Sequence, residues 1–378
     1  MTKRSLAVLS ALLLSITTIG FAGDHGVHQP TLTSQNSGTT NLLIAVSAAS
    51  PRVAWVAGAN GTFLRTTNGG QTWQVGVVPG AETLQFRDVE AVSDKVAYLL
   101  SISPSDPPVP TDFRIYKTTD GGKTWTMQFQ NHLAGAFYDC MAFWTPLRGL
   151  AHSDSVNGVF PDIRTRNGHT WESISANMPP ALPGEASFAS SGTCVATQGG
   201  RNAWIATGGA SVARILATRD GGNTWNAYDT PLVSSPSAGA FTVAFRTPWN
   251  GIVGGGDLDP NDPNNARTAV SHDGGMTWTL TAPPPVTGAI FGLAYVDGVG
   301  HNDDRDGMKH NEDHDGEGSR SVVITADKGG AAWTPDEGKT WYSLPNASGF
   351  WGVTFASPKA GWMVGRNGQI LKVSFQEH

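Results

Sequence analysis

The sequence predicts an all-β protein, a seven-bladed β-propeller built from four-stranded blades. Three observations support this prediction. A turn phrase of eight residues recurs along the chain, two short apolar runs precede each copy, and the composition combines 46 Gly and 13 Trp with only 15% charged residues. Glycine, aromatic residues and frequent turns are typical of proteins made of many short strands.

The phrase occurs first as TTNGGQTW at residues 66–73 and next as TTDGGKTW at residues 118–125. Six copies, here called octads, end at a tryptophan every 46 to 63 residues, and the third copy, TRNGHTW, is one residue short. Repetition at this period indicates a repeat architecture. The octad positions predicted to be structural are Asn68, Trp73, Asp120, Trp125, Asn167, Trp171, Asp220, Trp225, Asp273, Trp278, Asp336 and Trp341.

We interpret each octad as a tight turn between two strands. The Asp or Asn side chain can accept backbone N–H groups, and the glycines can take positive φ angles. The tryptophan supplies a large apolar side chain that packs against the blade. A phosphate-binding loop would need Lys-Ser/Thr after the last glycine and a following helix, and neither is present.

The runs before each octad define the rest of the unit. Residues 54–58 and 97–101 are apolar runs that precede the first two octads, and a further run lies upstream of each. The unit is therefore strand A, strand B, strand C, octad and strand D, repeated seven times. The seventh unit lacks strand D, which residues 28–34 can supply, so that the ring closes without an open sheet edge.

The octads resemble the Asp-box, or BNR, repeat, S/T-x-D-x-G-x-T-W. That repeat occurs in β-propellers of sialidases, glycanases, sortilin-like receptors and photosystem II stability/assembly factors. The even array of units looks most like the assembly-factor group of exported bacterial proteins. The sialidase pattern is not matched, because Phe113-Arg114-Ile115-Tyr116 lacks the proline of that family's arginine signature and no Tyr/Glu nucleophile pair can be placed.

Residues 1–22 have the pattern of a secretory signal peptide. Lys3 and Arg4 precede an apolar run, and Gly20-Phe21-Ala22 provides a small-x-small cleavage site. We therefore expect a single propeller domain over residues 23–378 that is periplasmic or secreted. An uncleaved N-terminal anchor is the alternative. No later segment of the sequence is apolar enough to span a membrane, and the net charge of −6 gives no general attraction to nucleic acid.

Strand order assigns residues to faces. Connections B–C and D–A share one face, called the top face, whereas turns A–B and the octads share the bottom face. The candidate ligand-binding residues of the top face are Arg114, Asp139, His152, Asp154, Glu185, Arg214, Asp257 and Arg267. They indicate either a pocket for an anionic or polyhydroxy ligand or a peptide, or a repeat consensus whose arginines are paired with neighbouring acids.

An acidic insert at residues 299–320 lies between strands A and B of the sixth unit. Asn302, Asp304, Asp306 and Asp313 match part of a calcium loop, but the usual twelfth-position Glu is Asp and no helices flank it. A weak calcium site, a solvated acidic loop and a histidine-based transition-metal site remain open.

Cys140 and Cys194 occupy equivalent positions on strand A of adjacent blades. Equivalent side chains point the same way around the ring, whereas a disulfide needs converging side chains. We therefore expect two buried thiols rather than a disulfide.

These observations predict a non-enzymatic, exported binding scaffold that recognises a protein partner through its top face. The protein is expected to be a monomer without a cofactor, apart from weakly bound calcium. The alternatives are an extracellular glycan-active hydrolase that uses a pair of top-face carboxylates, and a glycan-binding module without turnover.

Overall fold

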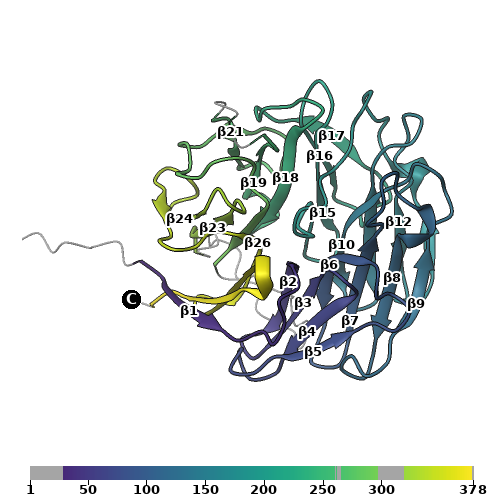
Figure 1. Cartoon of the computed structure of the whole chain (residues 1–378). Coiled ribbons are helices and arrows are strands. Elements are labelled where there is room, and N and C mark those ends of the chain that lie inside the picture. The colour runs from purple at the N-terminus through teal and green to yellow at the C-terminus, as the bar shows by residue number, and fades with distance from the viewer. Residues whose placement is uncertain (1–28, 260, 262–264, 297–318, 377–378) are drawn as a thin grey trace, which may run out of the picture.

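The computed structural model describes residues 29–259, 261, 265–296 and 319–376. Their backbone forms seven four-stranded antiparallel sheets arranged as blades around a central channel (Figure 1). In blades 1 to 6 each strand pairs with its neighbour in sequence, so strand A is innermost and strand D outermost. The prediction of a seven-bladed β-propeller is confirmed.

Blades 1 to 3 follow the predicted strand order. Blade 1 contains β2 (Leu43–Ser50), β3 (Val53–Gly58), β4 (Thr62–Thr66) and β5 (Gln74–Val77). Blade 2 contains β6 (Gln85–Ala91), β7 (Ala97–Ile102), β8 (Arg114–Thr118) and β9 (Thr126–Gln130). Blade 3 contains β10 (Tyr138–Thr145), β11 (Arg148–Ser153), β12 (Ile163–Thr165) and β13 (Trp171–Ser173).

Blades 4 to 6 repeat this order. Blade 4 contains β14 (Val195–Gln198), β15 (Asn202–Thr207), β16 (Arg214–Thr218) and β17 (Asn226–Asp229). Blade 5 contains β18 (Ala238–Phe245), β19 (Gly251–Asp257), β20 (Thr268–Ser271) and β21 (Thr279–Leu280). Blade 6 contains β22 (Gly292–Tyr295), β23 (Val322–Thr325), β24 (Ala331–Thr334) and β25 (Tyr342–Ser343). Short 3-10 turns occur at Pro110–Asp112, Ser175–Asn177 and Arg366–Gly368.

Blade 7 joins the two ends of the chain. It contains β26 (Phe350–Ser357), β27 (Ala360–Gly365) and β28 (Ile370–Ser374), and its outer strand is β1 (Thr31–Gln35). Thr31 pairs with Ser374 and Gln35 pairs with Ile370. Figure 1 shows the purple N-terminal strand beside the yellow C-terminal strands. The predicted closure of the ring is confirmed.

The hydrophobic core is divided among the contacts between neighbouring blades. Seven clusters of buried side chains occur, one for each pair of adjacent blades. Each octad tryptophan packs between its own blade and the preceding one, as Trp125 does against Trp55 and Phe63 of blade 1. The repeated tryptophan therefore stabilises contacts between blades.

The octads form turns between strands C and D. In the second octad, Thr124 donates to Asp120 from its amide (2.9 Å) and from its hydroxyl (2.6 Å). Gly121 and Gly122 have φ of 78° and 82°, in the left-handed region where a side chain would be strained. The same Asp-to-Thr bonds recur at Asp220 and Asp273.

The expectation of two free thiols is wrong. Cys140 and Cys194 form a buried disulfide with Cα atoms 5.9 Å apart, which joins blades 3 and 4. The prediction assumed that both residues follow the regular alternation of a strand. Cys194, however, lies in a turn one residue before β14 begins, where the alternation of side-chain directions does not hold, so its sulfur can face blade 3.

Three predictions fall outside the described residues. These are the signal peptide, most of the acidic insert, and the metal-ligand set Asn302, Asp304, Asp306 and Asp313. Among the residues that the structure does describe, no helix is long and apolar enough to cross a membrane.

Candidate functional site

The predicted top-face arginines bind loops of their own chain. Arg214 donates through Nε to Glu185 Oε1 at 2.9 Å, and its Nη2 pairs with the other carboxylate oxygen. Glu185 also accepts from Thr207 Oγ1 (2.7 Å) and from the amide of Leu182 (2.8 Å). This ion pair is buried and fully hydrogen-bonded, so it fixes the loop that leads into blade 4.

Arg267 and Arg114 have related contacts. Arg267 is buried and donates to the carbonyl of Val286 at 2.7 Å, in the connection from blade 5 to blade 6. Arg114 donates to the carbonyl of Thr111 at 2.7 Å, and its side chain is 21% exposed. At Asp257, the carboxylate accepts from the Ser237 hydroxyl at 2.9 Å. These contacts hold top-face loops in place, and the four residues do not converge on one pocket.

Asp139 and Asp154 do come together. Burial first, and then the neighbouring Asp154 carboxylate, raise the pKa of Asp139 well above its usual value. Burial also raises the pKa of Asp154, although the amide of Ser187 donates to it at 2.8 Å and opposes this shift. The charge of Arg87 opposes the shift of Asp139, and burial lowers the pKa of Arg87 itself to about 10.

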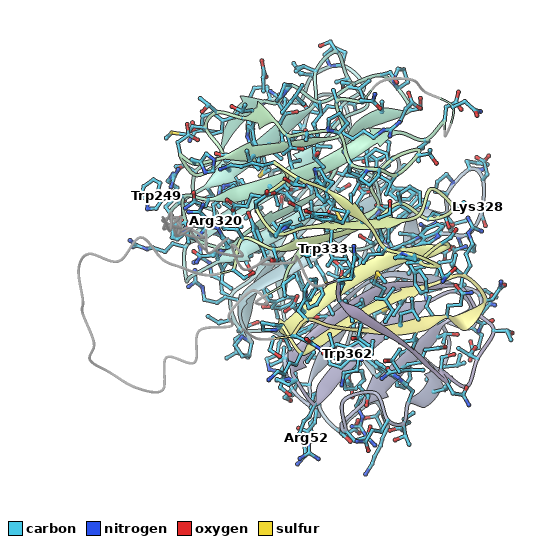
Figure 2. All side chains as sticks on the ribbon, turned by 90° about the vertical axis from the view of Figure 1, so that its left-hand side faces the viewer. Arg52, Trp249, Arg320, Lys328, Trp333 and Trp362 are labelled. Atoms are coloured by element: carbon cyan, nitrogen blue, oxygen red, sulfur yellow. A yellow bond between two sulfur atoms is a disulfide. The ribbon has the colours of Figure 1, made fainter. Side chains whose placement is uncertain are left out.

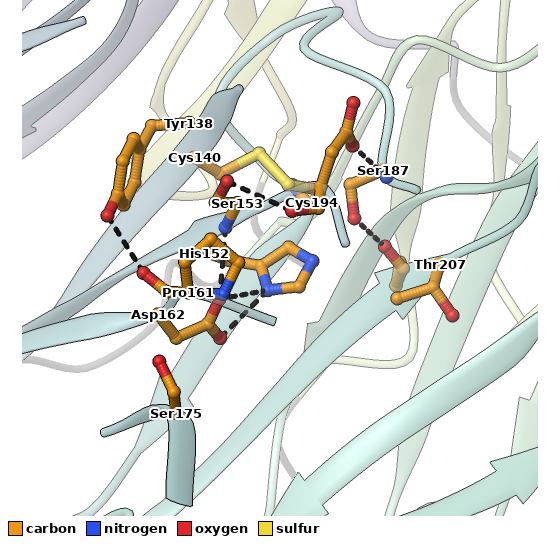
Figure 3. A network of polar contacts seen from close by, with 12 residues as sticks. Tyr138, Cys140, His152, Ser153, Pro161, Asp162, Ser175, Ser187, Cys194 and Thr207 are labelled. Carbon is orange, nitrogen blue, oxygen red and sulfur yellow. Dashed lines mark hydrogen bonds and ion pairs between the residues drawn. A yellow bond between two sulfur atoms is a disulfide. The ribbon is translucent and has the colours of Figure 1, made fainter. Parts of the chain in front are cut away.

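His152 is bound to a residue that the sequence did not single out. Its Nδ1 lies 2.9 Å from Asp162 Oδ2, and the amide of Ser153 donates to Asp162 Oδ1 at 3.0 Å (Figure 3). Both side chains of this pair are fully buried. Asp162 lies in the connection between strands B and C, and no motif or repeat position marks it.

A collar of side chains surrounds the top mouth of the channel. On strand A of blades 1, 2, 3, 5 and 7, the register skips one residue at a β-bulge. The residues at this position are Ile44, Arg87, Asp139, Phe241 and Trp351, and the equivalent residues of blades 4 and 6 are Thr193 and Phe291. A β-bulge changes the direction of the side chain at the extra residue. The collar side chains therefore do not follow the regular alternation of side-chain directions along strand A.

Three of the seven collar residues are aromatic. The ring centroids of Phe241 and Phe291 are 6.2 Å apart, and those of Phe291 and Trp351 are 5.0 Å apart. The Trp351 ring also lies 5.3 Å from the guanidinium of Arg87 and 5.7 Å from that of Arg366. Arg366 is held in turn by Asp327, which accepts two bonds of 2.6 Å.

A plug, defined as residues 186–193, lies across this mouth. Phe188 stacks on Phe241 with ring centroids 3.8 Å apart. Arg87 of blade 2 donates to the carbonyl of Ala189 at 2.7 Å, and the hydroxyl of Ser191 donates to the carbonyl of Phe291 in blade 6 at 2.6 Å. One segment of blade 4 thus contacts blades on both sides of the axis and closes the top of the channel.

The channel continues below the plug as a cavity of about 560 Å³. Ser191, Gly192 and Thr193 of the plug line one end, and turns of the bottom face line the other. Its wall includes one apolar residue from strand A of each blade: Val46, Val89, Met141, Val195, Val243, Leu293 and Val353.

Three polar atoms of the collar region have no hydrogen-bond partner within the described part of the chain. They are Nε of Arg87 and Oδ2 of Asp139, both collar residues, and Oε1 of the neighbouring Gln85; all three atoms are buried. Buried polar atoms are normally paired, so a polar group bound at the mouth could satisfy them. Within the same described part, no group of three or more His, Cys, Asp or Glu could hold a metal ion.

Comparisons with known proteins agree with this architecture. The BNR/Asp-box repeat matches residues 269–280, which contain the fifth octad. The chain is thus a seven-bladed β-propeller that contains a BNR/Asp-box repeat. No curated protein matches the sequence.

Two solved structures of YCF48 are similar to this chain. YCF48 bound to D1 peptide is 16% identical with a TM-score of 0.59, over 93% of this chain and 98% of that chain. YCF48 from Cyanidioschyzon merolae is 17% identical with a TM-score of 0.60, over 91% of this chain and 98% of that chain. The WD40 β-propeller domain of Doa1 is also similar, at 10% identity and a TM-score of 0.55, over 91% of this chain and 96% of that chain. At these identities the likeness shows the shared propeller fold.

Proposed function

We propose that this protein is a non-enzymatic, assembly-factor-like scaffold that binds a protein partner at the top mouth of the propeller. The single observation that carries the proposal is the half-buried aromatic surface of Phe188, Phe291 and Trp351. Tryptophan and arginine are enriched among the residues that dominate protein interfaces, and here Trp351 lies between two guanidinium groups. The D1 peptide named with YCF48 is consistent with a polypeptide ligand for a propeller of this kind.

The scaffold is rigid where recognition would occur. The Glu185–Arg214 ion pair, the disulfide and the bonds of the plug hold the loops before a partner arrives. Pre-organisation of this kind lowers the entropic cost of binding. We further propose that the mature protein is exported and is a monomer without a cofactor, apart from calcium at the insert.

Glycoside hydrolysis remains the second candidate, because Asp139 and Asp154 form a carboxyl pair. Burial raises the pKa of both carboxyls, and the Asp154 carboxylate adds to the shift of Asp139. Catalytic pairs that flank a glycosidic bond are about 5 to 9.5 Å apart. Hydrolysis also needs one member of the pair as an anion, whereas burial opposes ionisation of both, so the pair favours binding over hydrolysis.

Affinity capture from the native envelope and periplasm tests the proposal, with tagged protein from residue 23 onward. Wild-type protein should recover a stoichiometric protein partner, and Phe291→Ala/Trp351→Ala should lose it. Met127→Ala is a matched control, because Met127 is 47% exposed on the outer strand β9. Equal recovery by the double variant would overturn a top-mouth site. Turnover of a polysaccharide that is lost in Asp154→Asn would favour the hydrolase.

A further inference from the structure

The bottom face carries a second ring of equivalent residues, here called the tips. Each tip lies in the turn between strands A and B. In every blade, it is four residues before the same register position of strand B. The strand-B residues at this position are Val56, Leu99, Ala151, Ile205, Val253, Ile324 and Met363. The seven tips are Arg52, Lys95, Leu147, Arg201, Trp249, Arg320 and Lys359.

The octads hold most of the tips in place. The amide of the first octad glycine donates to the tip carbonyl in blades 1, 2, 4 and 5, and the amide of Glu337 does so in blade 6. These bonds are Gly69 to Arg52 (2.9 Å), Gly121 to Lys95 (2.9 Å), Gly221 to Arg201 (2.9 Å), Gly274 to Trp249 (2.8 Å) and Glu337 to Arg320 (3.1 Å). Equivalent bonds thus hold equivalent tip residues in these five blades, at the turns that face the bottom of the propeller.

Five of the seven tips are cations, and all seven are exposed. Arg148 follows Leu147 directly and adds a sixth cation. Within the described residues, the side chains of Arg52, Lys95, Arg201 and Arg320 form no ion pair. These charges stand out on a chain whose net charge is −6.

The two remaining tips are apolar. Trp249 is 54% exposed and Leu147 is 50% exposed. The Trp249 ring lies 4.8 Å from the guanidinium of Arg219, which leaves an amphipathic side chain beside a cation. Figure 2 shows Trp249 and Arg320 together at one end of the blades, with Lys328 at the opposite end.

We infer that the bottom face docks on an anionic phospholipid surface. Cations at the tips would contact headgroup phosphates, and Trp249 and Leu147 would enter the interfacial layer. Exposed cations spread over several blades of one face complement an array of headgroup phosphates. Tryptophan favours the membrane interface, and anionic lipids attract basic residues near the surface.

This inference goes beyond the proposed function, because the tips and the collar lie on opposite faces. A propeller docked in this way would present its top mouth to the solution. Residues 301–320 carry seven acids in the sequence, and 301–318 of them lie outside the described residues. The test therefore uses the whole mature chain.

Cosedimentation with vesicles tests the inference. Protein from residue 23 onward would be mixed with vesicles of phosphatidylcholine alone, or with about 30% phosphatidylglycerol. We expect binding only to the anionic vesicles, and loss of binding at high salt, since salt screens exposed charges. Arg52→Ala/Lys95→Ala/Arg201→Ala should weaken the partition roughly 100-fold, at about fivefold for each cation. No binding to anionic vesicles at low salt would overturn the inference.

Two single variants form a matched pair. Lys95→Ala should lower the partition about fivefold, whereas Lys328→Ala, an exposed lysine on the top face, should not change it. Equal effects of the two would show that binding is not a property of the tips, and would overturn the inference. Thermal unfolding of each variant confirms that it is folded.

Trp249→Ala separates a membrane from other polyanions. Loss of the ring should weaken vesicle binding several-fold and leave its salt dependence unchanged. Duplex DNA of the same phosphate concentration serves as the comparison. Binding to DNA that equals or exceeds binding to vesicles, with no effect of Trp249→Ala on either, would overturn a lipid surface in favour of a general polyanion. Capture of the top-mouth partner should be unchanged in every tip variant, so failure here is distinguishable from failure of the proposed function.

Discussion

The top mouth and the bottom face use aspartate in opposite ways. At the top, Asp139 and Asp154 are buried beside each other, and burial raises the pKa of both. At the bottom, the hydroxyl and amide of Thr124 bind Asp120 at the surface and lower its pKa to about 2. The octad aspartates therefore stabilise the fold as anions, whereas the top pair opposes ionisation at neutral pH. Groups with raised pKa at a mouth or cleft are typical of functional sites.

The largest expected effect is at a buried ion pair of the top face. Arg214→Ala leaves the Glu185 carboxylate buried without its counter-charge, and should lower the free energy of unfolding by about 3–5 kcal/mol. Urea denaturation measures this. The exposed counterpart is Glu172, 54% exposed beside Arg164, where Glu172→Ala should cost about 0–1 kcal/mol. Similar losses in the free energy of unfolding at the two sites would contradict the contrast between the buried ion pair of the top face and the exposed one.

Removing the disulfide should have the next largest effect. Cys140→Ser/Cys194→Ser releases a link between residues 54 apart, and should cost about 2–4 kcal/mol in chemical denaturation. Hydrogen exchange should quicken in the plug and stay unchanged in the octads. A native mass that does not increase by two hydrogens on reduction would show that the thiols are free.

The two faces should also respond to pH in opposite directions. An acid whose pKa is raised by folding contributes stability that is fully present below its unfolded value of about 3.9 and is lost as the pH rises toward the folded value. Asp139→Asn removes this loss. The free energy of unfolding of the variant, relative to that of the wild type, should therefore increase as the pH rises from 4 to 8. Parallel stability curves in urea would refute this assignment. For Asp120 the sign is reversed, and its contribution is present above about pH 3.9 and is lost as the pH falls toward 2.

A smaller effect than that of the buried ion pair or the disulfide is expected at a single octad. Asp273→Ala removes the acceptor for the Thr277 amide and hydroxyl, and should cost about 1 kcal/mol, as at a helix cap. Thermal unfolding checks the value, with Asp273→Asn as a control that keeps one acceptor oxygen. A loss above about 3 kcal/mol would mean that one octad stabilises more than its own turn.

Sequence reasoning reached the architecture because the evidence for it is local and repeated. Each octad predicts one turn from its own residues. Seven copies of the same strand order then predict a closed ring of seven blades. The collar could not be predicted, because β-bulges at Arg87 and Trp351 displace the side chains from the regular alternation. Asp139, His152, Asp154 and Glu185 were named as candidates, but their partners lie in irregular connections. Asp162 and the plug have no repeat equivalent, so their contacts depend on tertiary structure alone.

The shared blade at the chain ends has a consequence for biosynthesis. β1 is among the first segments of the domain to be made, yet its partner β28 is the last strand. The earlier blades can stack as they are synthesised, but the ring stays open until the final residues are released. A ribosome-bound intermediate would therefore expose the side of blade 1 that faces blade 7. Such long-range pairing slows folding, so this domain should depend on helper factors most at the stage when β1 and β28 pair.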